Sequence, residues 1–193
     1  MAIPINIEDL LNKRKIESNR IEFKKGWNPD KIYRTICAFA NDFDNIGGGY
    51  IVVGIEEEER TGIAKRPVTG VPIEALNDIQ KDMVGYNNKI EPYYMPRIDV
   101  QEVDGKSVLV IWAPAGVNRP YNVRERVTAK QSPSKWYIRS GTSTIEAKGE
   151  VLDELREMAN RTPFDERGNE RIEISDISPA LVLDYLQTVG SRL

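Results

Sequence analysis

Apolar and polar residues alternate along several short segments, which is the pattern of strands with one buried face. Residues 20–25 ("RIEFKK") alternate in this way, and residues 50–55 ("YIVVGI") form a nearly continuous apolar run, typical of a strand buried on both faces. Residues 95–103 and 106–113 flank the sequence "VDGK", and Asp-Gly between two such runs predicts a β-hairpin. Residues 136–139 predict a further strand.

Helical periodicity follows Pro29, a residue suited to the first turn of a helix. Apolar side chains then recur at i, i+4, i+7, i+8 and i+11, which is one face of a helix. They are Ile32, Ile36, Phe39, Ala40 and Phe43. Further helices are predicted over residues 5–12, 73–87, 144–161 and 179–189.

The order of these elements predicts the fold class and the division of the chain. Helices and strands are mixed, so we expect an α+β domain with a mixed β-sheet flanked by helices. The 193 residues suffice for one ordinary domain with a small appendix. We place the domain at residues 1–147 and a short helical, acidic C-terminal tail at residues 148–193.

The glycines of "NIGGGY" (residues 45–50) lie between the predicted helix and the predicted strand. A phosphate-binding loop has the reverse order, because its glycines follow a strand and open a helix. Gly47 is therefore predicted to be the left-handed C-cap of the helix, with the next glycines turning into the strand. With no glycine-rich loop opening a helix, we expect no ATP site.

Two residue types limit the chemistry. The chain has no histidine, which excludes Ser-His-Asp and Cys-His catalysis and every imidazole metal ligand. Its one cysteine, Cys37, excludes an internal disulfide and a thiolate zinc cluster, and is predicted to be a small buried helix residue. Any metal would lie among carboxylates, which favours Mg²⁺ or Mn²⁺.

Charge is unevenly distributed, although the net charge is only −3. Residues 146–193 contain 11 acids and 6 bases, whereas residues 117–145 contain six bases and one acid, Glu125. The six bases are Arg119, Arg124, Arg126, Lys130, Lys135 and Arg139. This local excess predicts either a phosphate-facing surface or a solvated basic loop.

The carboxylates near the two N-terminal strands form a candidate site. Alternation puts Glu22 and Lys24 on one face of their strand, with Glu17 just upstream, and Glu56 is the first acid after the second strand. If the strands are neighbours, three carboxylates and a lysine converge, a set suited to metal-dependent phosphodiester cleavage. The alternative is that these are ordinary exposed charges.

Several motifs occur together in the order of a known family. They are "ESNRIEFKKGW", "ICAFANDFDNIGGGYIVVGIEEE", "TGV" and "KWYIRSGTST". In this combination the sequence resembles the Schlafen AlbA-type domain, found in bacterial transcriptional regulators and in eukaryotic schlafen proteins. The resemblance runs from Glu17 to about Ala147.

The resemblance implies a sheet domain related to nucleic-acid-binding folds and two activities. Bacterial members imply DNA binding, and some schlafens imply cleavage of structured RNA by an acidic trio with a divalent metal. Carried onto this sequence, the trio is Glu17, Glu22 and Glu56, the last in place of the usual aspartate. The C-terminal segment resembles a linker to a downstream region, so the chain is either a short member or a piece of a longer one.

Three hypotheses follow. The first is a DNA-binding module of a bacterial transcriptional regulator, with DNA favoured over RNA, acting through the six bases named above. The second is a metal-dependent endoribonuclease using Glu17, Glu22 and Glu56 with Lys24, and the third is a protein-interaction or sensing domain. Tandem lobes in schlafens imply a homodimer. No apolar run reaches membrane-spanning length and no signal-peptide pattern is present, so we expect a cytoplasmic protein.

Overall fold

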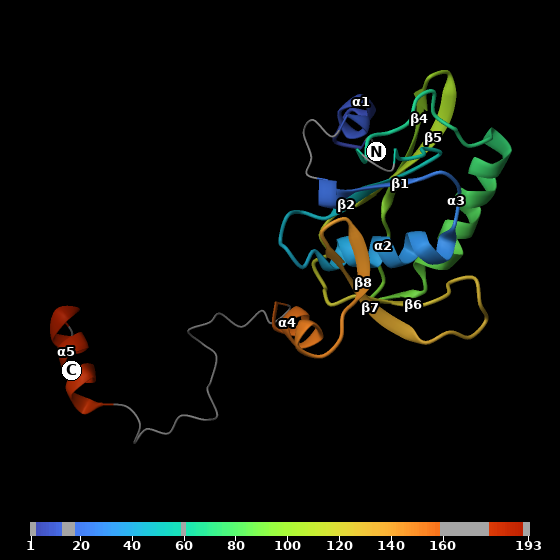
Figure 1. The fold of residues 1–193 in the computed structure, drawn as a ribbon. Coiled ribbons are helices and arrows are strands. Elements are labelled where there is room, and N and C mark those ends of the chain that lie inside the picture. The colour runs from blue at the N-terminus through green and yellow to red at the C-terminus, as the bar shows by residue number, and fades with distance from the viewer. Residues whose placement is uncertain (1–2, 13–17, 59–60, 159–177, 191–193) are drawn as a thin grey trace. The chain divides into compact units, whose positions relative to one another are not determined.

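The computed structural model describes residues 3–12, 18–58, 61–158 and 178–190 (Figure 1). The chain divides into two units, Met1–Ala159 and Asn160–Leu193. In the second unit the described part is one helix, α5 (Pro179–Thr188), as predicted. The first unit contains every other element, and its mixture of helices and sheets confirms the α+β class.

The first sheet has the strand order β1-β2-β5-β4. Its strands are β1 (Ile21–Lys24), β2 (Gly49–Val53), β5 (Lys106–Ala113) and β4 (Arg97–Val103). β1 and β2 are parallel neighbours, and the other pairs are antiparallel. The predicted hairpin is confirmed, because Asp104 and Gly105 form its turn with φ of 52° and 70°. Lys106 therefore begins a strand. The segment Gly105-Lys106-Ser107 matches the end of a phosphate-binding loop motif, but it opens a strand and not the helix that such a loop precedes.

The second sheet has the strand order β3-β6-β7-β8 and is antiparallel throughout. Its strands are β3 (Ile90–Glu91), β6 (Asn122–Arg124), β7 (Ser134–Ser140) and β8 (Ser143–Glu146). β8 corrects the helix predicted from residue 144. A two-residue loop with Gly141 at φ 56° turns the chain back onto β7, and the helix α4 (Glu150–Met158) begins only after Gly149.

Helix α2 (Pro29–Asn41) lies between the two sheets (Figure 1). One core cluster joins it to Ile51 of the first sheet, Tyr137 of the second and Leu76 of helix α3 (Ile73–Asn87). The other face of the first sheet has its own core, closed by helix α1 (Ile7–Leu11). Because α2 is covered on two sides, it buries more residues than its predicted apolar face. Among them is Cys37, and burial raises the pKa of its thiol to about 12.

The end of α2 differs from the prediction that Gly47 caps it. Asp42 occupies the left-handed position, with φ 44°. Its carboxylate accepts hydrogen bonds from the backbone N–H groups of Ile46, Gly47 and Gly48 at 3.0–3.1 Å. Gly48 must be glycine here, because a Cβ would clash with the carbonyl oxygen of Ala113.

Asn41, the last residue of α2, is fully buried and links the helix to the second sheet. Its Nδ2 donates to the carbonyl oxygens of Tyr121 at 2.9 Å and Tyr137 at 2.8 Å, and its Oδ1 accepts from the Tyr121 N–H at 2.6 Å. One side chain therefore satisfies three backbone groups, of which the Tyr121 carbonyl also accepts from the Cys37 thiol at 3.3 Å.

Asn41→Ala should lower the free energy of unfolding by about 3–5 kcal/mol, because it leaves buried backbone groups without partners at roughly 1–3 kcal/mol each. Urea denaturation monitored by circular dichroism measures this. Asn88→Ala is the control, since Asn88 is exposed and donates to the Val84 carbonyl of its own helix at 3.2 Å. Equal losses in the two variants would contradict the assignment.

Candidate functional site

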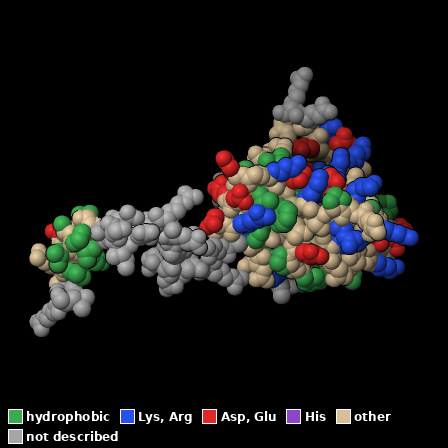
Figure 2. Space-filling model, turned by 90° about the horizontal axis from the view of Figure 1, so that it is seen from below, with side chains coloured by type: hydrophobic (Ala, Val, Ile, Leu, Met, Phe, Trp, Pro, Cys, Tyr) green, Lys and Arg blue, Asp and Glu red, His purple; other side chains and the backbone are tan. Residues whose placement is uncertain are grey.

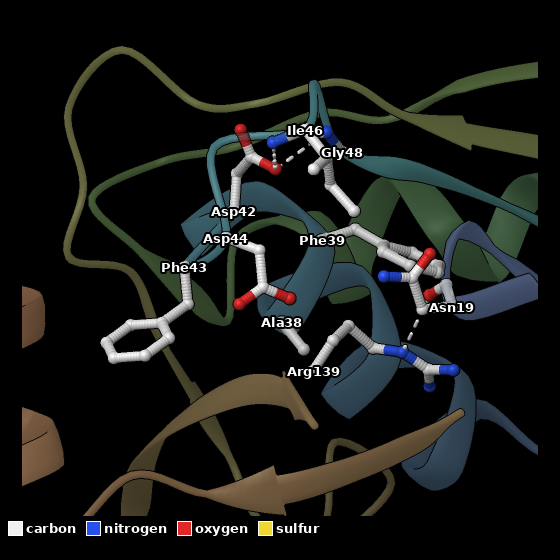
Figure 3. A pocket seen from close by; sticks show the side chains of 9 residues that line it. All are labelled: Asn19, Ala38, Phe39, Asp42, Phe43, Asp44, Ile46, Gly48 and Arg139. Atoms are coloured by element: carbon white, nitrogen blue, oxygen red, sulfur yellow. Dashed lines mark hydrogen bonds between the residues drawn. The ribbon is translucent and has the colours of Figure 1, made fainter. Parts of the chain in front are cut away.

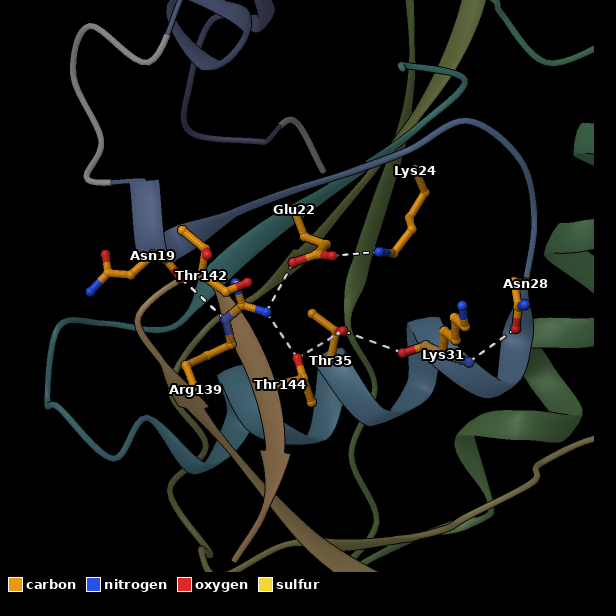
Figure 4. A network of polar contacts seen from close by, with 9 residues as sticks. All are labelled: Asn19, Glu22, Lys24, Asn28, Lys31, Thr35, Arg139, Thr142 and Thr144. Carbon is orange, nitrogen blue, oxygen red and sulfur yellow. Dashed lines mark hydrogen bonds and ion pairs between the residues drawn. The ribbon is translucent and has the colours of Figure 1, made fainter. Parts of the chain in front are cut away.

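An open cleft of about 340 Å³ lies between β1, α2 and the β7–β8 hairpin (Figure 4). It is lined by Glu22, Lys24, Lys31, Arg34, Thr35, Thr142, Ser143 and Thr144. Charged and hydroxyl side chains from three separate parts of the chain therefore surround one space. We call this space the cleft.

The strand register aims β1 side chains into the cleft. Glu22 lies beside Ile51, and Lys24 lies beside Val53. Ile51 and Val53 face the α2 side of the sheet. Ile21 and Phe23 enter the opposite core. The alternation predicted for this strand is thus confirmed, and so is the expectation that β1 and β2 are neighbours.

Arg139 of β7 is the buried anchor of the cleft, with only 6% of its side chain exposed. Its Nη1 donates to Glu22 Oε2 and to Thr144 Oγ1, both at 2.9 Å. Its Nη2 donates to the Thr142 carbonyl at 2.6 Å, and its Nε donates to the Asn19 carbonyl at 3.3 Å. The Glu22–Arg139 ion pair therefore connects the first sheet to the second.

Two further contacts complete the walls of the cleft. The second carboxylate oxygen of Glu22 pairs with Lys24 Nζ on the same strand. The hydroxyls of Thr35 on α2 and Thr144 on β8 lie 3.1 Å apart, so a hydrogen bond joins the helix to the hairpin. The cleft is thus fixed from all three sides.

Glu56 lies just beyond β2 and pairs with other cations. Its Oε1 is 3.0 Å from Lys65 Nζ, and its Oε2 is 3.0 Å from Lys25 Nζ. These hydrogen bonds hold the pKa of the Glu56 carboxyl below its usual value. Glu56 is not among the residues that line the cleft.

The predicted three-glutamate site is only partly described, because Glu17 lies outside the described residues. Within the described ranges, no group of three or more His, Cys, Asp or Glu side chains could hold a metal ion. Glu22 and Glu56 are each paired with two cationic side chains of their own. The site containing Glu17 stays a prediction.

Three of the six predicted basic residues bind groups in other elements of the fold. Arg119 donates to the carbonyls of Asn41 and Asp42 at the end of α2. Lys135 forms ion pairs with Glu125 at 2.8 Å and with Glu146 at 3.2 Å, and Arg139 is the anchor described above.

Of the other three, Arg124 ends β6, and Arg126 and Lys130 lie in the loop between β6 and β7. Arg124 donates to the Lys130 carbonyl at 3.2 Å, and the side chains of Arg126 and Lys130 are exposed. In Figure 2, Lys and Arg side chains on the visible face are interspersed with acidic ones rather than forming one unbroken patch.

Lys31 and Arg34 of α2 are cleft residues that the sequence interpretation missed. Arg34 Nε donates to the Glu125 carbonyl at 3.1 Å, and Asp30 accepts from the Thr128 N–H at 3.0 Å. The β6–β7 loop therefore lies against this side of α2. A signal was present, since Lys31, Arg34 and Thr35 form an i, i+3, i+4 polar stripe opposite the apolar face.

A second pocket lies behind Arg139 and is lined by Asn19, Phe39, Asp44 and neighbouring residues (Figure 3). Its volume is about 10 Å³, close to the minimum for one water molecule. The Asn19 Oδ1 is buried without a hydrogen-bond partner among the described residues. This pocket suits a water rather than a ligand.

Comparison with known proteins agrees with the resemblance read from the motifs. The family model described as "Schlafen, AlbA_2" matches residues 17–148, which is most of the chain. The chain belongs to the Schlafen AlbA_2 family. No curated protein matches the sequence significantly.

Two solved structures are similar to this Schlafen AlbA_2 chain. The DIP2311 protein from Corynebacterium diphtheriae has 19% identity and a TM-score of 0.52 over 97% of this chain, which spans 38% of that protein. The N-terminal domain of a RecG-related protein from Nitrosomonas europaea has 26% identity and a TM-score of 0.48, covering 70% of this chain and 88% of that domain. The first likeness supports the fold. None of the described helices is long and apolar enough to cross a bilayer.

Arg139→Met should destabilise the first unit by about 3–5 kcal/mol, the usual cost of leaving one partner of a buried ion pair behind. Urea denaturation measures the loss, and hydrogen exchange should show faster opening of the β7–β8 turn. Arg156→Met is the control, because Arg156 is exposed and pairs with Asp153 on the same helix at 3.2 Å. A loss no larger than the control's would contradict the anchoring role.

Proposed function

We propose that this chain is a nucleic-acid-binding module of a transcriptional regulator, with duplex DNA as its ligand. The observation that carries the proposal is the charge of the described residues that line the cleft, where three cations, Lys24, Lys31 and Arg34, outnumber one carboxylate, that of Glu22. Family membership supports it, because the Schlafen AlbA-type resemblance implies DNA binding in bacterial members.

The chemistry of the cleft suits contacts to a phosphate backbone. Lys and Arg side chains supply charge, and Ser and Thr hydroxyls supply the uncharged donors that commonly bind phosphate oxygens. Thr142 and Ser143 are exposed at the turn of the β7–β8 hairpin, and Lys31 is exposed on α2. A backbone lying along the cleft would meet all three.

The β6–β7 loop would extend this contact surface. Arg126 and Lys130 are exposed there, and the Arg34–Glu125 hydrogen bond places the loop next to the cleft side of α2. We therefore assign phosphate contact to Arg126 and Lys130, and to Arg124, which donates to the Lys130 carbonyl. Arg119, Lys135 and Arg139 would instead shape the surface through the internal bonds described above.

Binding should be modest, because the whole chain carries a net charge of −3. It should also depend strongly on salt, because each phosphate contact releases counterions. The excess of acids over bases comes from residues 146–193, which are separate in sequence from the cationic segments. Local attraction at the cleft, rather than the overall charge, would drive association.

Replacing Lys31 and Arg34 together by alanine should weaken binding to a labelled DNA duplex and make its salt dependence shallower. The slope of log affinity against log salt should become less negative by about 0.9 for each lost phosphate contact. Fluorescence anisotropy over a series of KCl concentrations measures this. A second pair, Arg126→Ala with Lys130→Ala, should behave in the same way.

Lys81→Ala with Arg156→Ala is the matched control, since it removes two exposed cations that do not line the cleft. Lys81 pairs with Asp78 on its own helix, and Arg156 contacts Asp153 and the Trp136 ring. An unchanged slope in both test pairs would reject the cleft and the loop as the contact surface. Tighter binding to duplex RNA than to duplex DNA would reject the choice of DNA while leaving the module intact.

A dimeric regulator is part of the proposal and rests on the resemblance to proteins with tandem lobes. Sedimentation of the chain with and without DNA tests it, and a monomer under both conditions would remove this part.

A further inference from the structure

The family resemblance implies a divalent metal held by the glutamates, and the described residues do not fit one. We infer that the cleft instead binds a phosphate group directly, without a metal ion, and that Glu22 is a positioning residue, whereas Glu56 pairs with two lysines that do not line the cleft. This inference rests on the proposed function and specifies how its site meets the ligand.

The first argument is the occupancy of the carboxylate oxygens. Mg²⁺ and Mn²⁺ need carboxylate oxygens that face an open coordination position. Both oxygens of Glu22 are engaged, one by Lys24 and the other by Arg139 at 2.9 Å. Both oxygens of Glu56 are engaged as well, by Lys65 and Lys25 at 3.0 Å.

The second argument is that Arg139 is fixed in place. It is buried and also donates to Thr144 and to the carbonyls of Thr142 and Asn19. A metal at Glu22 would have to displace a guanidinium that four acceptors hold. Losing one partner of such a buried pair is costly, so the arrangement favours the ion pair over the metal.

The third argument is the sign of the charge. Among the described residues that line the cleft, Glu22 is the one acidic side chain, against three cationic residues, Lys24, Lys31 and Arg34. Arg139 adds a further positive charge directly behind Glu22. A cleft with this balance attracts an oxyanion and repels a divalent cation.

These contacts give Glu22 a positioning role. It binds Arg139, and Arg139 in turn fixes the Thr142 carbonyl and the Thr144 hydroxyl of the hairpin turn. The turn presents Thr142 and Ser143 to the cleft. Glu22 thereby sets the place of hydroxyl donors that it does not touch, while its own charge opposes the bound anion.

The metal-free and metal-dependent sites predict opposite effects of Glu22→Gln. Glutamine keeps the shape and an acceptor oxygen but removes the negative charge. In EDTA, affinity for inorganic phosphate should rise about two- to fivefold, as expected for removing one charge a few ångströms away in a solvated site. NMR titration, following the backbone amides of residues 142–144, measures it.

Three further variants make the result specific. Glu22→Asp keeps the charge and should not raise the affinity. Glu56→Gln should leave phosphate affinity unchanged, because Glu56 does not line the cleft. Glu74→Gln removes an exposed charge on α3 and should also have no effect.

Manganese titration of the wild-type chain, followed by electron paramagnetic resonance, is the independent measurement. We expect no stoichiometric binding at micromolar Mn²⁺. Micromolar binding that Glu22→Gln or Glu56→Gln abolishes would overturn the inference, as would weaker phosphate binding by Glu22→Gln. If Glu22→Gln does not fold, Glu56→Gln and the wild-type titration decide the question.

The outcomes separate this inference from the proposed function. DNA binding that requires Mn²⁺ and is lost in Glu22→Gln supports the module and rejects the metal-free site. Phosphate binding in EDTA that Glu22→Gln strengthens, without any DNA binding, rejects the module and keeps the anion site.

Discussion

The architecture depends on one buried amide. Asn41 ends the central helix and supplies three hydrogen bonds to the backbone of the Tyr121 and Tyr137 segments. Because α2 packs on the first sheet through its apolar face, these bonds set the second sheet at a fixed distance from the first. The cleft is the space left along the side of α2 where the two sheets do not meet.

The Glu22–Arg139 ion pair is a second link between the sheets, and it has a different character. Asn41 satisfies neutral groups deep in the core, whereas Arg139 brings a buried charge up behind Glu22, which lines the cleft. Such a pair adds little net stability once desolvation is counted, but it fixes which atoms face the opening. Under the proposed function, structure and ligand recognition share the same side chains.

Local patterns in the sequence were sufficient for most of the fold. Strand alternation predicted the direction of Glu22 and Lys24, and the Asp104-Gly105 turn predicted the hairpin. The strand β8 was missed because its pairing with β7, rather than its own helical periodicity, decides its conformation.

The state of the glutamates was not predictable in the same way. A carboxylate that pairs with Lys or Arg has the same sequence signature as one that binds metal, and the partner of Glu22 lies 117 residues away. The polar stripe on α2 was readable, yet only the packing of a distant loop and hairpin turned it into a cleft wall.

The sandwiching of α2 also has a consequence for synthesis on the ribosome. The first sheet is complete once residue 113 has emerged, but the strands β6, β7 and β8 that cover the other side of the helix end only at residue 146. At roughly 5–20 residues per second, the uncovered helix waits for seconds with apolar side chains in water. The nascent chain at this stage is a natural client for chaperones, and the cleft is among the last features to mature.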